Sequence, residues 1–257
     1  MNKMPKFSLK EYKSLMITLI EAGYSFASIS SFKDWEVSNK NIIFLRHDVD
    51  FHLYRINEMA DLEKELGIQA TYYILTDGLY NPWNKENSEQ IKHLIKSGHE
   101  IGLHYDLTLY PVHDNILARR KLDEQLNMLQ NVTGKDIKTI VMHQPFMGQP
   151  DIFKELPEYI HPHSSSLQDN TIYISDSCRV WRDTTLLELL KNPPSSVRVM
   201  LNFHPELWLG DPEDNRIDYL FKTVKSNMSN DLNIFLRNIE NIWNSHEAVL
   251  LHEKRVK

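Results

Sequence analysis

The sequence predicts a single α/β domain built as a closed or nearly closed β/α barrel, with an open doubly wound sheet as the alternative. Two observations predict this fold class. Short apolar runs rich in β-branched and aromatic residues alternate with longer segments of helical spacing, and the alternation is unbroken to about residue 150. Such alternation is typical of parallel strands joined by right-handed helical crossovers, because parallel neighbours need a long connection.

The regular part opens with a helix. Ser8 and Glu11 have the Ser-x-x-Glu spacing of a capping box, which predicts an amphipathic helix from this point to near Gly23. Four strands and three helices are expected to follow in alternation. The expected strands cover residues 42–47, 68–75, 99–105 and 137–145, and the expected helices cover residues 53–66, 88–98 and 115–134.

The alternation loosens in the last third of the chain. Residues 151–170 have the composition of an irregular loop, two further strands are expected at 171–175 and 197–204, and one or two helices are expected within 217–246. Since no repeat or linker interrupts the chain, we expect one domain over residues 1–257. Residues 1–40 are expected to form a helical extension that packs on the barrel.

Composition excludes several classes of protein. The chain has 257 residues and a net charge of −6, so there is no global electrostatic case for binding nucleic acid or an anionic membrane. No window approaches the roughly 20 apolar residues of a membrane span, and the apolar run near the N-terminus is too short for a signal peptide. The single cysteine, Cys178, excludes an internal disulfide. We expect a soluble, cytoplasmic protein and leave its oligomeric state open.

Imidazoles and carboxylates follow the apolar runs of the expected strands. The residues are His47, Asp48 and Asp50 at the end of the first strand, then His104, Asp106, His143, Asp176 and His204 at the ends of later ones. In parallel α/β folds the carboxyl ends of the strands lie on one face. These side chains are therefore expected to share a pocket, and a metal ion is the ligand that most readily collects histidine and aspartate together.

Asp48 and Asp50 are the strongest signal of function. Two carboxylates this close to each other, at the end of a buried strand, repel each other unless a cation or a shared proton reduces the repulsion. Other histidines are expected to be structural. His99 and His104 resemble a zinc-protease motif, but their spacing of five places them on opposite faces of a strand.

Two histidines fall in the irregular part of the chain. His161 and His163 lie in a stretch rich in proline and serine, and we expect them in a solvated loop.

Three segments together resemble one known superfamily. They are FLRHDVD (44–50), LEKELGIQATYYI (62–74) and SGHEIGLHYD (97–106). They are similar to the polysaccharide deacetylase superfamily (NodB homology, carbohydrate esterase family 4), in particular to its branch with Arg-His-Asp-Val-Asp in place of Thr-Phe-Asp-Asp. MHQPF (142–146) and LNFHPELW (201–208) resemble the later Arg-Pro-Pro-Tyr and histidine motifs of the family.

The resemblance implies a distorted (β/α)7 barrel and a divalent metal, usually zinc, that supports hydrolysis of the N-acetyl group of an amino sugar. By this resemblance Asp48 matches the catalytic base, and Asp50 is the metal carboxylate, displaced by one residue from its usual position. His104 matches the first metal histidine, and His204 matches the late histidine that acts as general acid.

The sequence departs from the family pattern at two positions. The second metal histidine of the family falls on Thr108, and the arginine that braces the catalytic aspartate falls near His143. We predict that His143 is the third metal ligand, because imidazole is a far better zinc donor than a hydroxyl group and its strand neighbours that of His104. Asp106 is the rival, and a site with no third protein ligand is the remaining alternative.

The predicted function is metal-dependent hydrolysis of an amide, most simply N-deacetylation of an amino-sugar precursor in surface polysaccharide biosynthesis. The side chains predicted to contact the substrate are Tyr105, Asp106, Asp176, Trp181 and Trp208. Three alternatives stay open: a hydrolase of a non-sugar amide, a glycosyltransferase that uses Asp48-Val-Asp50 as a metal-binding DxD motif, and an inactive barrel that serves as a binding protein.

Overall fold

A computed structural model describes residues 3–35, 40–144, 150–169 and 171–243 of the chain. The chain divides into two compact units, Met1–Glu213 and Asp214–Lys257. The second unit contains one long helix, α8 (Arg216–Trp243). Within the described ranges, no helix combines the length and the apolar content needed to cross a bilayer. The single domain over residues 1–257 that the sequence suggests stays a prediction.

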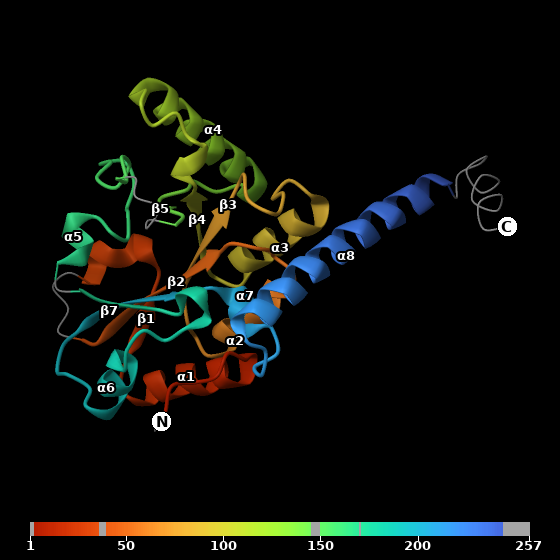
Figure 1. The fold of residues 1–257 in the computed structure, drawn as a ribbon. Helices are drawn as coiled ribbons and strands as arrows, with labels where there is room; N and C mark the ends of the chain where they lie inside the picture. The colour runs from red at the N-terminus through yellow and green to blue at the C-terminus, as the bar shows by residue number, and fades with distance from the viewer. Residues whose placement is uncertain (1–2, 36–39, 145–149, 170, 244–257) are drawn as a thin grey trace. The chain divides into compact units, whose positions relative to one another are not determined.

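The first unit is built on a parallel sheet of seven strands (Figure 1). The strands are β1 (Ser25–Ala27), β2 (Ile42–Val49), β3 (Thr71–Leu75), β4 (Glu100–Tyr105), β5 (Ile140–Met142), β6 (Thr171–Ser175) and β7 (Arg198–Phe203). Their order is β5-β4-β3-β2-β7-β6, and β1 pairs with the first half of β2. The sheet curls into a half barrel surrounded by helices, which confirms the predicted α/β fold of the distorted barrel type.

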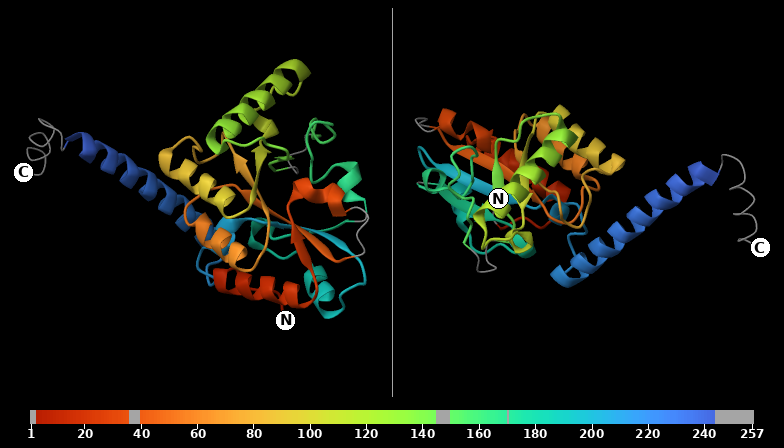
Figure 2. Two further views of the ribbon diagram at one scale, coloured as in Figure 1. Left: turned by 180° about the vertical axis from the view of Figure 1, so that it is seen from behind. Right: turned by 90° about the horizontal axis from the view of Figure 1, so that it is seen from above.

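Four helices lie around the outside of the strands (Figures 1 and 2). They are α1 (Leu9–Glu21), α2 (Ile56–Glu65), α3 (Lys85–Lys96) and α4 (Asn115–Thr133). The predicted start of α1 is confirmed, because the Ser8 hydroxyl accepts a hydrogen bond from the backbone N–H of Glu11 at 3.2 Å. The helix α4 ends at Gly134, whose φ of 65° is a left-handed backbone conformation that favours glycine.

Several element boundaries differ from the predictions. β2 extends to Val49, so Asp48 lies within the strand and is buried, whereas the sequence analysis placed it after the strand. The short elements that the sequence analysis missed are β1, the 3₁₀ segments Ile29–Trp35, Leu107–Leu109 and Ser177–Arg179, and the helices α5 (Ser165–Gln168), α6 (Thr185–Lys191) and α7 (Pro205–Trp208). Most are too short to show a hydrophobic period.

Several sequence predictions extend beyond the described residues. These parts are residues 1–2 and 36–39 of the predicted N-terminal extension, the end of the predicted strand and of the MHQPF motif at 145–146, the last residue of the predicted loop at 170, and the end of the last predicted helical region at 244–246.

The register of the sheet decides which side chains face the inside of the half barrel. Asp48 on β2 pairs with Tyr73 on β3, and Tyr73 pairs with Gly102 on β4. Paired residues of a parallel sheet project to the same face. That face begins with an apolar cluster of Ala27, Ile29, Phe32, Ile42, Phe44, Tyr73, Val141, Leu167 and Met200. Toward the carboxyl ends of the strands the same face becomes polar.

The outer face of β2 carries a second polar network, centred on Glu63 of α2. The fully buried Glu63 carboxylate accepts hydrogen bonds from His47 Nε2 at 2.7 Å, from Tyr72 Oη at 2.8 Å and from Tyr12 Oη. His47 is therefore not part of the pocket at the strand ends, which corrects the sequence analysis. His99 is also buried on this outer side, with Nδ1 at 3.7 Å from Glu63 Oε2, so its predicted structural place is confirmed.

The Glu63 network predicts a large loss of stability when its centre is removed. Glu63→Ala leaves buried hydroxyl and imidazole groups without their acceptor, and we expect a loss of about 3 kcal/mol in the free energy of unfolding. Urea denaturation measures it. Glu65→Ala, an exposed change on the same helix, is the matched control and should cost less than about 0.5 kcal/mol. Equal losses in the two variants would contradict a special role for Glu63.

Candidate metal centre

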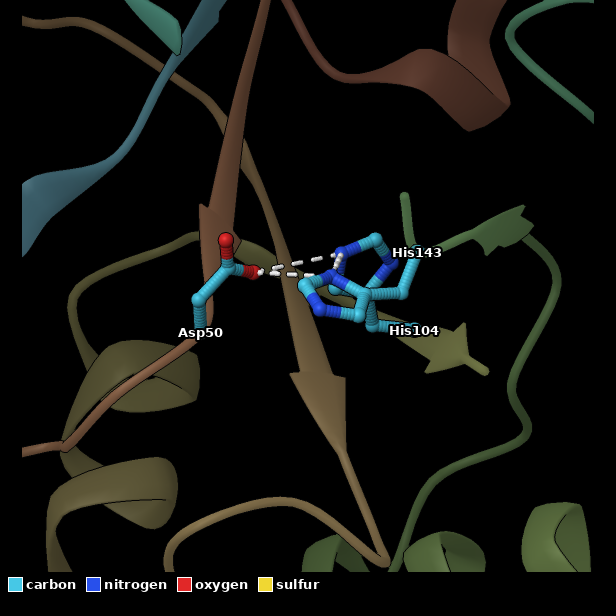
Figure 3. A group of neighbouring side chains, drawn as sticks. All are labelled: Asp50, His104 and His143. Carbon is cyan, nitrogen blue, oxygen red and sulfur yellow. Dashed lines mark hydrogen bonds and ion pairs between the residues drawn. The ribbon is translucent and has the colours of Figure 1, made fainter. Parts of the chain in front are cut away.

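Three predicted ligands converge at the carboxyl ends of the strands (Figure 3). His104 Nε2 lies 3.4 Å from Asp50 Oδ1, His143 Nδ1 lies 3.3 Å from the same oxygen, and the two nitrogens are 3.2 Å apart. A tetrahedral zinc ion with bonds of about 2.0–2.1 Å separates its donor atoms by about 3.3 Å. The three atoms therefore have the spacing of neighbouring ligands on one small metal ion.

Each donor atom is aimed by a backbone or side-chain contact. Glu206 accepts hydrogen bonds from the backbone N–H groups of Asp50 and Phe51 at 2.8 and 3.0 Å, which holds the turn after β2. His104 Nδ1 lies 3.0 Å from the Val141 carbonyl oxygen. Because a carbonyl only accepts, the proton is on Nδ1 and the lone pair of Nε2 faces the cluster, as in metal-binding histidines.

The electrostatics of this cluster suit a cation. Asp50 Oδ1 is buried and accepts no hydrogen bond of good geometry from any residue that the structure describes. Burial alone would raise the pKa of Asp50, but the imidazoles of His104 and His143 outweigh it and hold that pKa well below its usual value. An ionised carboxylate and two imidazoles, whose ring nitrogens offer lone pairs once they give up their protons, fit a divalent metal ion at this spacing.

The rival ligand Asp106 and its neighbour Thr108 lie outside the cluster of Asp50, His104 and His143. Asp106 Oδ1 accepts hydrogen bonds from the backbone N–H and the hydroxyl of Thr108, at 2.9 and 2.7 Å. The two residues thus cap the short 3₁₀ turn after β4. His143, which follows β5, is instead held by a hydrogen bond from its backbone N–H to the Tyr105 carbonyl at 2.7 Å. Of the candidates for a third ligand, the structure brings His143 to the cluster.

Asp48 lies beside the cluster as one half of a buried ion pair. Arg46 donates to both of its carboxylate oxygens, from Nε at 3.0 Å and from Nη2 at 2.6 Å, and Asn202 donates from Nδ2 at 3.1 Å. Burial alone would raise the pKa of Asp48, but Arg46 outweighs it and holds that pKa well below its usual value. The position of the family's bracing arginine falls near His143 in the sequence, and here Arg46, from the same strand and face as Asp48, makes the contact with this carboxylate.

His204 forms a dyad with Asp176. His204 Nδ1 lies 2.6 Å from Asp176 Oδ1, and Trp208 Nε1 donates to the other carboxylate oxygen at 2.7 Å. Burial alone would lower the pKa of His204, but Asp176 outweighs it and raises that pKa well above its usual value. His204 Nε2 lies 3.7 Å from Asp50 Oδ2, so the charged imidazole borders the three donor atoms.

Four of the predicted substrate contacts pack against other residues of the chain. Asp176, Tyr105 and Trp208 are fully buried. Trp181 stacks on Phe7 at 5.6 Å and donates to the Pro5 carbonyl at 3.0 Å. Tyr105 and Trp208 are therefore closed to a sugar ring, the half-buried Trp181 is covered on one face by Phe7, and the Asp176 carboxylate contacts His204.

The cluster itself reaches solvent through a few side chains. Asp50, His143 and His204 keep 13–14% of their side-chain surface exposed. His104, by contrast, is 2% exposed and forms the floor of the site. A small ligand would therefore approach the three donor atoms from the side of Asp50, His143 and His204.

Sequence reasoning missed the residues that support the cluster. From segments remote in sequence, Glu206 contacts the backbone of Asp50, Asn202 contacts Asp48 and His163 contacts Arg46. His161 and His163 were expected in a solvated loop, but His161 is buried and His163 contacts the buried Arg46. The reason is a parallel bridge between residues 139 and 160, which ties this loop to the edge of the sheet beside β5.

No family model and no curated protein matches the chain. Solved structures do match. A CE4 family pseudoenzyme from Bacillus anthracis has 15% identity and a TM-score of 0.43 over 72% of this chain, which spans 60% of that protein. A family 4 carbohydrate esterase from the same organism has 16% identity and a TM-score of 0.43, covering 90% of this chain and 92% of that one.

A third match is the chitin deacetylase of Colletotrichum lindemuthianum, with 16% identity, a TM-score of 0.43 and coverage of 72% of this chain and 81% of that one. By name, these proteins belong to the family that the motifs resemble. Similarity at this level carries no conclusion about activity, which depends on the residues of this chain.

The geometry of the cluster predicts which substitutions remove the metal. We expect His143→Ala to weaken binding of Zn²⁺ at least about tenfold, because it removes one of three protein donors. Asp106→Ala and Thr108→Ala should bind like the parent, since both side chains cap a turn outside the cluster. Metal content after dialysis and titration with Zn²⁺ measure this. An Asp106 variant that alone comes out empty would reverse the assignment.

Proposed function

We propose that this protein is a metal-dependent hydrolase that removes the acetyl group from the nitrogen of an amino sugar. One observation carries the proposal. The three donor atoms of Asp50, His104 and His143 are bordered by an ionised carboxylate, Asp48, and by the charged imidazole of His204. A base and an acid beside a metal site are the groups that hydrolysis of an amide requires. Zn²⁺ is the preferred ion, because two imidazoles and one carboxylate suit it.

The residues divide the proton transfers between them. When bound, a divalent ion would acidify a water molecule and polarise the acyl carbonyl group. Asp48, kept ionised by Arg46, accepts the proton of the attacking water. His204, kept protonated by Asp176, donates a proton to the nitrogen of the departing amine, which is too basic to leave as an anion. Asp176 also fixes the ring, because Nδ1 is committed to it and Nε2 faces the cluster.

The proposed substrate class rests on the sequence motifs. Their resemblance to the polysaccharide deacetylases supports an N-acetylated amino sugar, and a precursor in surface polysaccharide biosynthesis is the source that we propose for it. A non-sugar amide would need the same base, acid and metal ligands. Acetate release from a panel of N-acetyl sugars and simple acetamides, with Zn²⁺ supplied, separates the two substrate classes.

The geometry weakens the glycosyltransferase alternative. In a DxD site both aspartates would serve a metal bound to a nucleotide diphosphate, but Asp48 is committed to Arg46 and Asn202. Two of the three clustered donors are imidazoles, whereas magnesium and manganese sites favour oxygen ligands. An inactive barrel is the remaining alternative, and it predicts that metal binds without acetate release from any member of the panel.

The role of Asp48 predicts a loss of rate without a loss of metal. We expect Asp48→Asn to lower turnover by roughly 10²–10⁴-fold, because asparagine keeps the shape of the side chain but cannot take up the proton. Acetate release and metal content are measured on the same preparation. Near-normal turnover in a variant that retains its metal would exclude Asp48 as the base.

The dyad of His204 and Asp176 also predicts a loss of turnover without a loss of bound metal. His204→Ala should lower turnover by roughly 10²–10⁴-fold with metal content unchanged, because a proton donor need not be a ligand. Asp176→Asn should lower turnover in the same direction, since it removes the charge that keeps His204 protonated. Acetate release and metal analysis are again the measurements. If His204→Ala instead empties the site of metal, His204 is a ligand and the acid lies elsewhere.

A further inference from the structure

The guanidinium group of Arg46 is engaged on two sides. Nε and Nη2 donate to Asp48, while Nη1 lies 2.9 Å from His163 Nε2. Arg46 is 2% exposed, so water cannot readily replace either partner. Its planar fork has a fixed geometry, and the acceptor on one side therefore helps to set the angle at which the other side meets Asp48.

The contact with Arg46 fixes the protonation state of His163. Arginine stays charged and only donates, so His163 Nε2 accepts with its lone pair and the neutral ring carries its proton on Nδ1. Burial and the charge of Arg46 lower the pKa of His163 to about 3, in agreement with this tautomer. The ring also packs edge-on against Tyr173, with the ring centres 5.4 Å apart.

A chain of buried contacts holds His163 in place. Its backbone N–H donates to His161 Nδ1 at 3.1 Å, and His161 Nε2 faces Asp151 Oδ2 at 3.0 Å. Asp151 also accepts from the Tyr105 hydroxyl at 2.6 Å. Just before this segment, Ile160 pairs with the edge of the sheet beside β5. His163 is thus tied to the same sheet that carries Arg46.

We infer that His163 is a positioning residue for the proposed base: it accepts from Arg46 and so holds the guanidinium in the orientation that grips Asp48. The inference rests on the proposed function for its kinetic consequence. It is independent of the metal ligands, because the contacts of His163 are with Arg46, Tyr173 and its own segment. Without an acceptor at this position, the buried Nη1 donor would turn toward another partner and loosen its grip on Asp48.

The first test compares two substitutions of His163 by acetate release. His163→Leu removes the acceptor, and we expect a roughly 10–100-fold lower kcat with KM and metal content close to the parent. His163→Gln restores an acceptor oxygen near the position of Nε2, and we expect its kcat to lie within about threefold of the parent. His113→Leu, at an exposed histidine, is the matched control. Equal losses in the Leu and Gln variants would overturn the inference.

The second test asks whether His163 acts through Asp48. Adding His163→Leu to Asp48→Asn should produce no further loss of rate, because the positioned carboxylate is already gone. A full additional loss of roughly 10–100-fold would mean that His163 acts elsewhere and would overturn the inference.

A crystal structure of the His163→Leu variant provides a readout without turnover. In the His163→Leu variant we expect the Arg46 guanidinium to be rotated away from its two-bond contact with Asp48. In the His163→Gln variant we expect that contact to be kept. An unchanged two-bond contact in the Leu variant overturns the inference. If the parent releases no acetate but the guanidinium moves as expected, the proposed function fails while the positioning role stands.

Discussion

The ion pair between Arg46 and Asp48 is the interaction on which the rest of the site depends. Both side chains are buried on the inner face of β2, where a lone charge would be costly and the removal of one partner can destabilise a protein by about 3–5 kcal/mol. The pair is tolerated because each charge has further partners, His163 for the guanidinium and Asn202 for the carboxylate. The segment that carries His163 folds against the edge of the sheet, and this brings His163 to the buried guanidinium.

The outer face of β2 carries a buried network that stabilises the fold, and its inner face carries the residues of the candidate site. On the outer face His47 joins Glu63, and this network links α1, α2 and β3 to the strand. On the inner face Asp48 borders the donor atoms of Asp50 and His104. Alternation along one strand places neighbouring residues in these two environments. A change at His47 is thus expected to act on folding, whereas a change at Asp48 is expected to act on the proposed reaction as well as on stability.

Much of the fold and part of the site could be predicted from periodicity. The alternation of strand and helix implied a parallel sheet, and the position of Asp48 and Asp50 at the end of its first predicted strand pointed to a shared pocket at the carboxyl ends of the strands. The strand ends also identified His104 and His143, which the structure brings to Asp50. Burial could not be predicted for the aromatic candidates, because an aromatic residue near a strand end serves equally well as core, as with Tyr105 and Trp208.

The sequence by itself determined which side chains of each strand share a face, because that follows from a period of two residues. Only the tertiary structure decided their partners. Arg46 contacts His163, Glu206 holds the backbone of Asp50, and Asp176 keeps His204 protonated. In each case the two residues lie far apart in the sequence, and no local sequence pattern indicates that they meet. Such contacts depend on strand order and register and on the bridge beside β5, which bring distant segments together without a local sequence signal.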